Sequence, residues 1–305
     1  MMESIATREA YGKTLVELVE NKDIVVLDAD LAGATKTAMF KKACPERFFD
    51  MGIAEGDMMG TAAGLAVSGK IPFASTFAIF AAGRGFEQIR NSICYPNINV
   101  KIAATHAGVT VGEDGGSHQA IEDISLMRSL PNMVVLNPAD AVEARQMVLA
   151  AAEYVGPMYL RFGRAATPVI HDESYKFELG KGEVVKEGKD VSIIATGIMV
   201  AKALEAAETL KADGIDAEVI NISTIKPLDN ELVLASAKKT GKVVTAEEHS
   251  IIGGLGSAVC ELLAEEHPVK VTRIGVKDVF GQSGSPAALL EHYGLTAADI
   301  VKACK

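Results

Sequence analysis

The sequence predicts an α/β protein of two domains, each a mainly parallel sheet with helices on both faces. Short apolar runs rich in β-branched residues alternate with amphipathic stretches along the chain. Ala and Gly are abundant, Trp is absent and aromatic residues make up 5%, a composition that suits helices packed closely on a sheet. At 305 residues the chain is also too long for one compact domain of ordinary size.

In the first half, five apolar runs are expected to form buried strands because turn or polar residues bound each of them. They span residues 23–31, 70–76, 99–105, 133–138 and 157–162. The stretch 141–155 places Val142, Met147, Val148 and Ala151 on one face of a helix. Alternation of this kind predicts a parallel sheet covered by helices.

A polar stretch at residues 171–190 interrupts this pattern and is expected to be a linker. The chain then divides into a first domain at 1–170 and a second at 191–305. Strands of the second domain are expected at 191–196, 217–222, 242–248 and 269–275. A second α/β series after a linker therefore predicts two sheets rather than one.

Charge and cysteine content restrict the class of protein. A formal net charge of −10 argues against nucleic acid or an anionic membrane as a main partner. The start of the chain has no apolar signal core, and no stretch approaches the roughly 20 apolar residues of a membrane span, so we expect a cytoplasmic protein. Four widely spaced cysteines without a CxxC pair predict neither a disulfide framework nor a thiolate zinc site.

The densest polar cluster is THAGVTVGEDGGSHQAIED at residues 105–123, and it begins where a predicted strand ends. Ligands of parallel sheets bind at the carboxyl ends of strands, so this position indicates a site. We expect His106, Asp114 and His118 to hydrogen-bond and exchange protons with a polyol or carbonyl substrate. Their spacing matches no tight metal-ligand pattern.

Three other features could carry chemistry. Glu55 lies among small and apolar residues in MGIAEGDMMG, so its carboxylate needs a partner or takes up a proton. Phe77 and Phe80 follow a predicted strand and either belong to the core or wall a pocket for a flat ring. Arg161 and Arg164 end another strand and could bind phosphate or carboxylate, although a surface ion pair explains Arg164 equally well.

Five segments resemble, in kind and in order, the carboxyl-terminal half of transketolases, a family of thiamine diphosphate enzymes. They are DADL, GIAEGDMMG, STFAIF, THAGVTVGEDGGSHQ and LRFGR. The resemblance spans essentially the whole chain, as a pyrimidine-binding domain followed by a C-terminal domain. It implies transfer of a two-carbon ketol unit between sugar phosphates, as in the pentose phosphate pathway.

The resemblance implies roles for individual residues at the cofactor. Glu55 would meet the aminopyrimidine ring nitrogen of thiamine diphosphate, while Phe77 and Phe80 would flank that ring. Asp30, the acid that matches the family's ADL segment, would lie near the cofactor.

At the substrate, the resemblance implies that His106, Asp114 and His118 contact hydroxyl groups of the donor sugar. Arg161 would hold the sugar phosphate. Glu55, His106 and His118 would then be the catalytic residues.

Two positions depart from the family pattern. Gly83 stands where a third aromatic residue is expected after Phe80, so the ring pocket is expected to be looser. Ala34, with Thr35 beside it, stands where the family has a serine after the ADL segment, so one phosphate contact of the family is not expected to carry over unchanged.

The family holds the diphosphate through Mg²⁺ with a G-D-G motif followed by Asn, and the 305 residues contain no match to it. The resemblance therefore implies a split enzyme in which a separate N-terminal subunit supplies the Mg²⁺ ligands. No metal ligand is expected in this chain, and dimerisation of the pair is expected.

Other readings of the sequence remain open. The β subunit of a 2-oxoacid dehydrogenase and a deoxyxylulose-phosphate-synthase-like enzyme share the chemistry, although His106 favours a sugar substrate. A dinucleotide-dependent oxidoreductase could use Gly253, Gly254 and Gly256, a weak nucleotide-loop signal because close helix packing explains such glycines more often. A non-catalytic scaffold that keeps only the fold is the last possibility.

Overall fold

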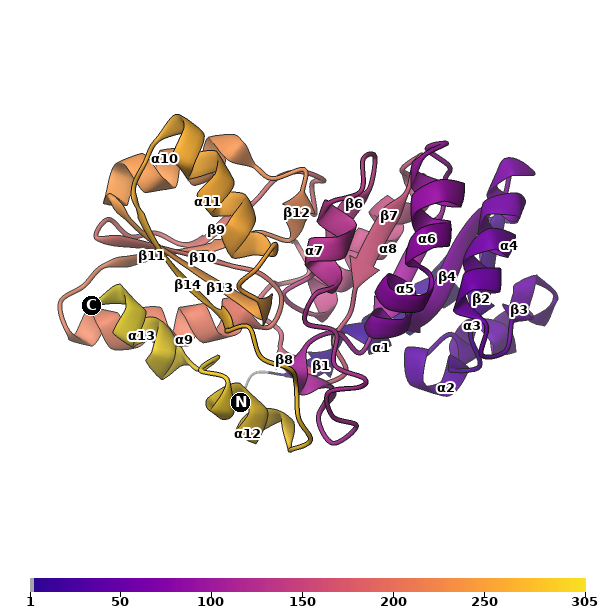
Figure 1. The fold of residues 1–305 in the computed structure, drawn as a ribbon, viewed down its shortest axis with the longest axis horizontal. Helices are drawn as coiled ribbons and strands as arrows, with labels where there is room; N and C mark the ends of the chain where they lie inside the picture. Colours follow the sequence, from indigo (N-terminus) through magenta and orange to yellow (C-terminus); the bar gives the residue numbers. More distant parts are fainter. Residues whose placement is uncertain (1–2) are drawn as a thin grey trace.

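The computed structural model describes residues 3–305, and two units, each centred on a sheet, lie side by side (Figure 1). Apart from the two large sheets, β1 (Ser4–Ala6) and β8 (Ala166–Pro168) form an antiparallel ribbon. The predicted α/β class with two mainly parallel sheets is confirmed. None of the helices within residues 3–305 combines the length and the apolar character that a membrane crossing requires.

The first unit contains a seven-stranded sheet. Its strands are β2 (Ile24–Asp28), β3 (Phe48–Asp50), β4 (Ile71–Phe77), β5 (Lys101–Thr105), β6 (Val134–Leu136), β7 (Met158–Arg161) and β12 (Thr224–Lys226). They run in the order β12-β6-β7-β5-β4-β2-β3, all parallel except β12, which comes from the second half of the chain and pairs antiparallel with β6. β2 and β5 are buried along their whole length because helices cover both faces.

Helices pack on both faces of this sheet (Figure 1). One face carries α4 (Glu55–Val67), α5 (Ala78–Arg84) and α7 (Asp123–Arg128), and the other α1 (Thr7–Glu17), α3 (Ala38–Ala43) and α8 (Ala141–Glu153). Shorter turns are α2 (Ala32–Thr35), α6 (Phe86–Gln88), η1 (Leu18–Glu20), η2 (Pro45–Arg47), η4 (Val109–Val111) and the π-helical η3 (Ile89–Cys94). In α8 the Asp140 side chain caps the first turn, and Met147, Val148 and Ala151 of the predicted face are buried, whereas Val142 is only partly buried.

The second unit repeats the arrangement with a five-stranded sheet of order β14-β13-β10-β11-β9. Its strands are β9 (Glu183–Lys186), β10 (Val191–Ala195), β11 (Ala217–Asn221), β13 (Lys242–Ser250) and β14 (Lys270–Val276). Its helices are α9 (Met199–Ala212), α10 (Asn230–Thr240), α11 (Leu255–Glu266), α12 (Pro286–His292) and α13 (Ala297–Cys304). α9 and α13 pack on one apolar cluster of the sheet, and α10 and α11 on another.

The polar stretch 171–190 is not only a linker. Its residues Glu183–Lys186 form β9, the antiparallel edge strand of the second sheet. A four-residue strand whose residues are all only partly buried gives a weak sequence signal, because no apolar run marks it. The second unit therefore begins before residue 191.

A polar network centred on the buried His171 joins this stretch to both units. His171 contacts Asp140 through Nδ1 at 3.0 Å and Glu183 through Nε2 at 2.9 Å. Asp140 caps α8 in the first unit, whereas Glu183 opens β9 in the second. Burial opposes the charged ring, but the hydrogen bonds to the two carboxylates prevail and raise the pKa of His171 to about 10. A protonated His171 thus donates to one carboxylate of each unit.

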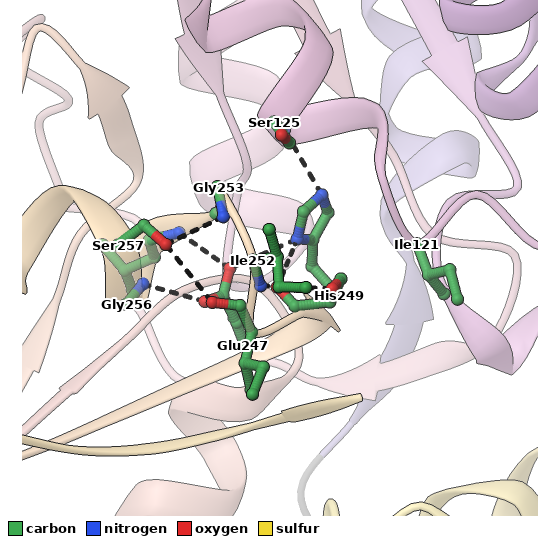
Figure 2. A network of polar contacts seen from close by, with 12 residues as sticks. Ile121, Ser125, Glu247, His249, Ile252, Gly253, Gly256 and Ser257 are labelled. Atoms are coloured by element: carbon green, nitrogen blue, oxygen red, sulfur yellow. Dashed lines mark hydrogen bonds and ion pairs between the residues drawn. The ribbon is translucent and has the colours of Figure 1, made fainter. Parts of the chain in front are cut away.

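The glycine segment before α11 holds a carboxylate of the chain itself (Figure 2). Glu247 accepts the Leu255 N–H at 2.7 Å and the Gly256 N–H at 2.8 Å, so its charge lies at the amino end of the helix. A Cβ at Gly254 would collide with the Glu247 carboxylate. Glycine is needed here to admit this acid, and the same N–H groups are not left for the phosphate of a dinucleotide, which argues against the oxidoreductase alternative.

His171→Gln is expected to remove a pH-dependent part of the stability. The pKa rises from 6.5 to about 10 on folding, so the contribution is full below pH 6.5 and is lost as the pH rises through 10. Between about pH 7 and about pH 10, the free energy of unfolding should fall by roughly 1.4 kcal/mol per pH unit more in the wild type than in the variant. Urea unfolding of both proteins at neutral and alkaline pH measures the difference, and parallel pH dependences would contradict it.

Glu247→Ala is expected to lower the free energy of unfolding by about 2–4 kcal/mol, because two buried N–H groups lose a charged acceptor. The urea midpoint, read with the slope of the transition, measures the loss. Glu265→Ala, at an exposed position of the same helix, is the matched control and should change stability by less than about 0.5 kcal/mol. Equal effects of the two substitutions would refute the capping role.

Candidate active site

Glu55 is the first residue of α4, just after β3 at the carboxyl edge of the first sheet. Its side chain is only 3% exposed, and Oε1 accepts a hydrogen bond from Arg84 Nη1 at 3.0 Å. Arg84 is 54% exposed, so the buried acid pairs with a surface cation rather than with an arginine of the core. The first turn of a helix also favours a negative charge.

Two phenylalanine rings and two histidine rings gather at the same edge. Phe77 ends β4 and stacks on Phe80 of α5, with ring centroids 5.7 Å apart and planes 12° apart. His106 stacks on Phe77 at 3.8 Å, and His118 stands edge-on to Phe80 at 5.4 Å. A Cβ at Gly83 would meet no atom within 4 Å, so the place of the third aromatic residue is open.

His106 has a defined protonation state. Arg8 Nη1, which can only donate, lies 3.0 Å from Nε2, so Nε2 accepts and Nδ1 carries the proton that faces Thr105 Oγ1 at 2.9 Å. Burial, with the positive charges of Arg8 and Arg164, lowers the pKa of His106 to about 3. His106 is therefore neutral at pH 7, and its backbone holds a left-handed φ of 57°.

Positive side chains surround His106. Arg8, Arg164 and Lys36 all act on its ring electrostatically. Arg164 Nη1 contacts Asp114 Oδ2 at 3.2 Å, with both side chains partly exposed, and Lys36 pairs with Glu9 at 3.0 Å. The cluster of Arg8, Lys36 and Arg164 beside neutral His106 is suited to an anionic group. Hereafter it is called the cation cluster.

Arg161 lies elsewhere than predicted. Its guanidinium is buried, with Nε 2.8 Å from Asp123 Oδ2 and Nη2 3.0 Å from the Glu248 carbonyl oxygen. Side chains alternate along a strand, so Arg161 points to the same side as Tyr159, which also bonds Asp123. A guanidinium committed to a buried ion pair is not placed to hold a sugar phosphate, the role expected for Arg161, whereas Arg164 is partly exposed.

In the segment after β2, some polar groups form buried hydrogen bonds and others are exposed. Asp28 is buried and accepts the Thr35 hydroxyl at 2.6 Å and the Leu31 N–H at 2.6 Å. Asp30, predicted near the cofactor, is exposed with a φ of 59°. Thr35 is committed to Asp28 and cannot replace the missing serine, whereas the Ala34 carbonyl oxygen accepts from Arg8 at 2.9 Å.

The second unit anchors the polar loop 106–119. Glu248 Oε1 accepts the Thr110 N–H at 2.6 Å, and Gln119 Nε2 donates to the Gln282 carbonyl at 3.0 Å. A Cβ at Gly108 would collide with the Glu248 carboxylate, and the φ of Gly108 is 81°. Burial raises the pKa of Glu248 to about 7.

The donor set near Glu55 suits a nitrogen heterocycle. Gln88 Oε1 is a buried acceptor without a hydrogen-bond partner among the described residues, and it would lie 3.3 Å from a Cβ at Gly56, beside Glu55. A carboxylate, two rings and an unpartnered amide oxygen can hold an aminopyrimidine. Within residues 3–305, no group of three or more His, Cys, Asp or Glu side chains is placed to bind a metal ion.

Sequence reasoning finds the loop residues at strand ends but not Arg8, Lys36, Glu248 or Gln88. Arg8 meets His106 across 98 residues and Glu248 meets Thr110 across 138, and no local pattern marks such pairs. The only available signal for Arg8 is an arginine at the start of an amphipathic helix, which is usually a solvated residue.

Known proteins match both units. The family model of the transketolase pyrimidine binding domain covers residues 3–169, and that of the transketolase C-terminal domain covers residues 180–300. The chain is 52% identical to a predicted transketolase C-terminal section of Methanocaldococcus jannaschii, over 97% of this chain and 94% of that protein. It is 47% identical to a 6-deoxy-6-sulfo-D-fructose transketolase subunit of Clostridium sp., over 97% of this chain and 92% of that one.

A solved structure of a split-gene transketolase, described as an inactive β4 tetramer, has a TM-score of 0.91 and 62% identity to this chain. The match covers 99% of this chain and 97% of that one. With both units matched by family models and nearly full-length relatives at these identities, the chain belongs to the transketolase family.

Proposed function

We propose that this chain is the C-terminal subunit of a split transketolase that transfers a two-carbon ketol unit between sugar phosphates and is active only with a separate N-terminal subunit. The observation that carries the proposal is that Arg84 links the Glu55 carboxylate to Phe80, whose ring stacks on Phe77 beside His106 and His118. Relatives named as a C-terminal section and as a transketolase subunit support the division into two chains.

Glu55, Phe77, Phe80 and Gln88 would hold the pyrimidine end of thiamine diphosphate. When bound, this cofactor supplies the carbon nucleophile that carries the ketol unit. Glu55 would hold a proton at the ring nitrogen, since a buried carboxyl at hydrogen-bond distance can exchange one. The two phenylalanine rings would fix the plane of the heterocycle and exclude water from that proton.

The diphosphate and Mg²⁺ are assigned to the partner subunit. The groups around Glu55 suit a neutral ring, whereas a diphosphate needs a metal ion or several cations. Ile53, two residues before Glu55, is 76% exposed, and an apolar residue beside a buried acid fits a surface that another chain covers. Dimerisation of the two-chain pair is part of the proposal, and the tetrameric relative supports self-association of such chains.

The substrate would lie over the histidine rings. His106 and His118 are assigned to hydroxyl groups of the donor sugar, and Asp114 to the rim where it meets Arg164. The cation cluster is assigned to the phosphate, because three positive side chains meet there beside a neutral imidazole. A phosphate site of this kind would favour a transketolase over a 2-oxoacid dehydrogenase.

Glu55→Ala, in the chain reconstituted with its N-terminal subunit, is expected to lower kcat by about 100-fold or more, as loss of a proton-exchanging group does. A coupled assay of ketol transfer from a ketose phosphate to an aldose phosphate measures kcat. The same assay with pyruvate as donor distinguishes the deoxyxylulose-phosphate-synthase-like alternative.

The control for Glu55 is Asp57→Ala, an exposed acid in the same first turn of α4. It should retain nearly full activity, and the isolated wild-type chain should show none. Full activity of the Glu55→Ala complex would support a scaffold, and ketol transfer by the chain alone would overturn the requirement for a partner.

Arg164→Ala is expected to raise KM for a phosphorylated donor by about 10- to 100-fold, the loss typical of a charge-assisted contact. KM for an unphosphorylated ketose should stay the same, since that donor makes no contact with the cation cluster. Arg145→Ala, which removes an exposed arginine paired with Glu17, serves as the control. An equal rise in KM for both donors would assign Arg164 to general folding of the site.

A further inference from the structure

Arg84, the last residue of α5, contacts two residues of the candidate site, Glu55 and Phe80. Its Nη1 donates to Glu55 Oε1 at 3.0 Å, and its Cζ lies 4.3 Å from the ring centroid of Phe80. The side chain of Arg84 is 54% exposed, whereas that of Glu55 is 3% exposed. A solvent-facing cation therefore pairs with a buried acid and covers a ring face at the same time.

Glu55 and Phe80 are also the groups that the proposed function assigns to the pyrimidine ring. A ring nitrogen needs the carboxyl of Glu55, and a stacked heterocycle needs an aromatic face. Arg84 already occupies Glu55 Oε1 with its Nη1 and one face of the Phe80 ring with its guanidinium. Arg84 and a flat nitrogen heterocycle therefore compete for the same two groups.

The surroundings of Arg84 allow it to leave this position. Ion pairs and cation–π contacts that reach solvent are weak. Gly83 and Gly85 flank Arg84, and a Cβ at Gly83 would meet no atom within 4 Å. Because the Arg84 side chain is 54% exposed, it can rotate into solvent and away from Glu55.

We propose that Arg84 is a displaceable counter-ion, which neutralises Glu55 until the pyrimidine ring of the cofactor takes its place. This inference rests on the proposed function and adds to it a competition within this chain. Burial costs the Glu55 carboxylate part of its hydration, and the half-exposed Arg84 offsets part of that cost whenever no ring is bound. Each binding event must break the contact between Arg84 and Glu55, so Arg84 lowers the affinity for the cofactor.

The assembled complex of the two subunits tests this in a binding measurement. Isothermal titration with thiamine diphosphate at saturating Mg²⁺ is expected to show about 3- to 10-fold tighter binding for Arg84→Met than for the wild type, the range that weak exposed contacts allow. Arg84→Lys keeps the charge and should bind more weakly than Arg84→Met. Equal or weaker binding by Arg84→Met overturns the proposal, because it means that Arg84 orients Glu55 instead of competing for it.

The matched control is Arg90→Met, an exposed arginine that contacts Asn91. Its affinity for thiamine diphosphate should equal that of the wild type. A gain as large as that of Arg84→Met would show a general effect of lost positive charge and would overturn the proposal.

A second measurement uses the isolated chain and needs neither partner nor activity. The probe is 4-amino-5-hydroxymethyl-2-methylpyrimidine, a neutral heterocycle without a diphosphate. Saturation-transfer NMR is expected to show tighter binding to Arg84→Met than to the wild type, and loss of binding in Glu55→Ala.

The two measurements separate the two proposals. If the complex does not transfer a ketol unit but the isolated Arg84→Met chain binds the probe more tightly than the wild type, the proposed function is refuted and the competition at Glu55 stands. An active complex whose wild-type and Arg84→Met chains bind the probe equally refutes the competition alone.

Discussion

The parallel register of β4, β5 and β7 is the constraint on which the site depends. Phe77 lies opposite Thr105, and Ala104 lies opposite Arg161, so the three strands end close to one level of the sheet. The loops that follow the three strands therefore all begin at the same carboxyl edge of the sheet, where ligands of parallel sheets bind. The stacking of Phe77 on His106 at 3.8 Å is a direct result of this register, since Phe77 is the last residue of β4 and His106 directly follows the neighbouring β5. A slip of one residue would turn the two rings to opposite faces.

The second unit completes this edge through two neighbouring acids of β13. Glu247 turns toward α11 and caps it, whereas Glu248 turns toward the first unit and accepts the Thr110 N–H. Their opposite directions follow from the alternation of side chains along a strand. One strand thus stabilises its own unit with one carboxylate and fixes the polar loop with the next, which explains why a second sheet belongs to a site whose rings all come from the first.

The parts of the fold and site that follow local rules could be predicted from the sequence. Buried strands are marked by apolar runs, and the polar loop behind β5 is marked by its position, so Glu55, Phe77 and His106 emerge as a group. Arg161 was expected at the site because it lies at a strand end. The sequence does not tell whether a side chain at a strand end points into the core or toward the site, and in the structure Arg161 forms a buried ion pair with Asp123. Arg8 could not be found, since its role exists only where α1 passes His106.

His106 cannot supply a pH dependence of the site near neutral pH. With a pKa lowered to about 3 by burial and by the nearby arginines, its ring keeps one tautomer through the whole neutral range. Glu248 is different, because burial raises its pKa to about 7 while its carboxylate holds the Thr110 N–H. Protonation of Glu248 replaces a charge-assisted hydrogen bond by a weaker neutral one and loosens the loop that carries His118. An acid-side loss of substrate binding near neutral pH would therefore not come from His106, and protonation of the Glu248 anchor is one change that would produce it.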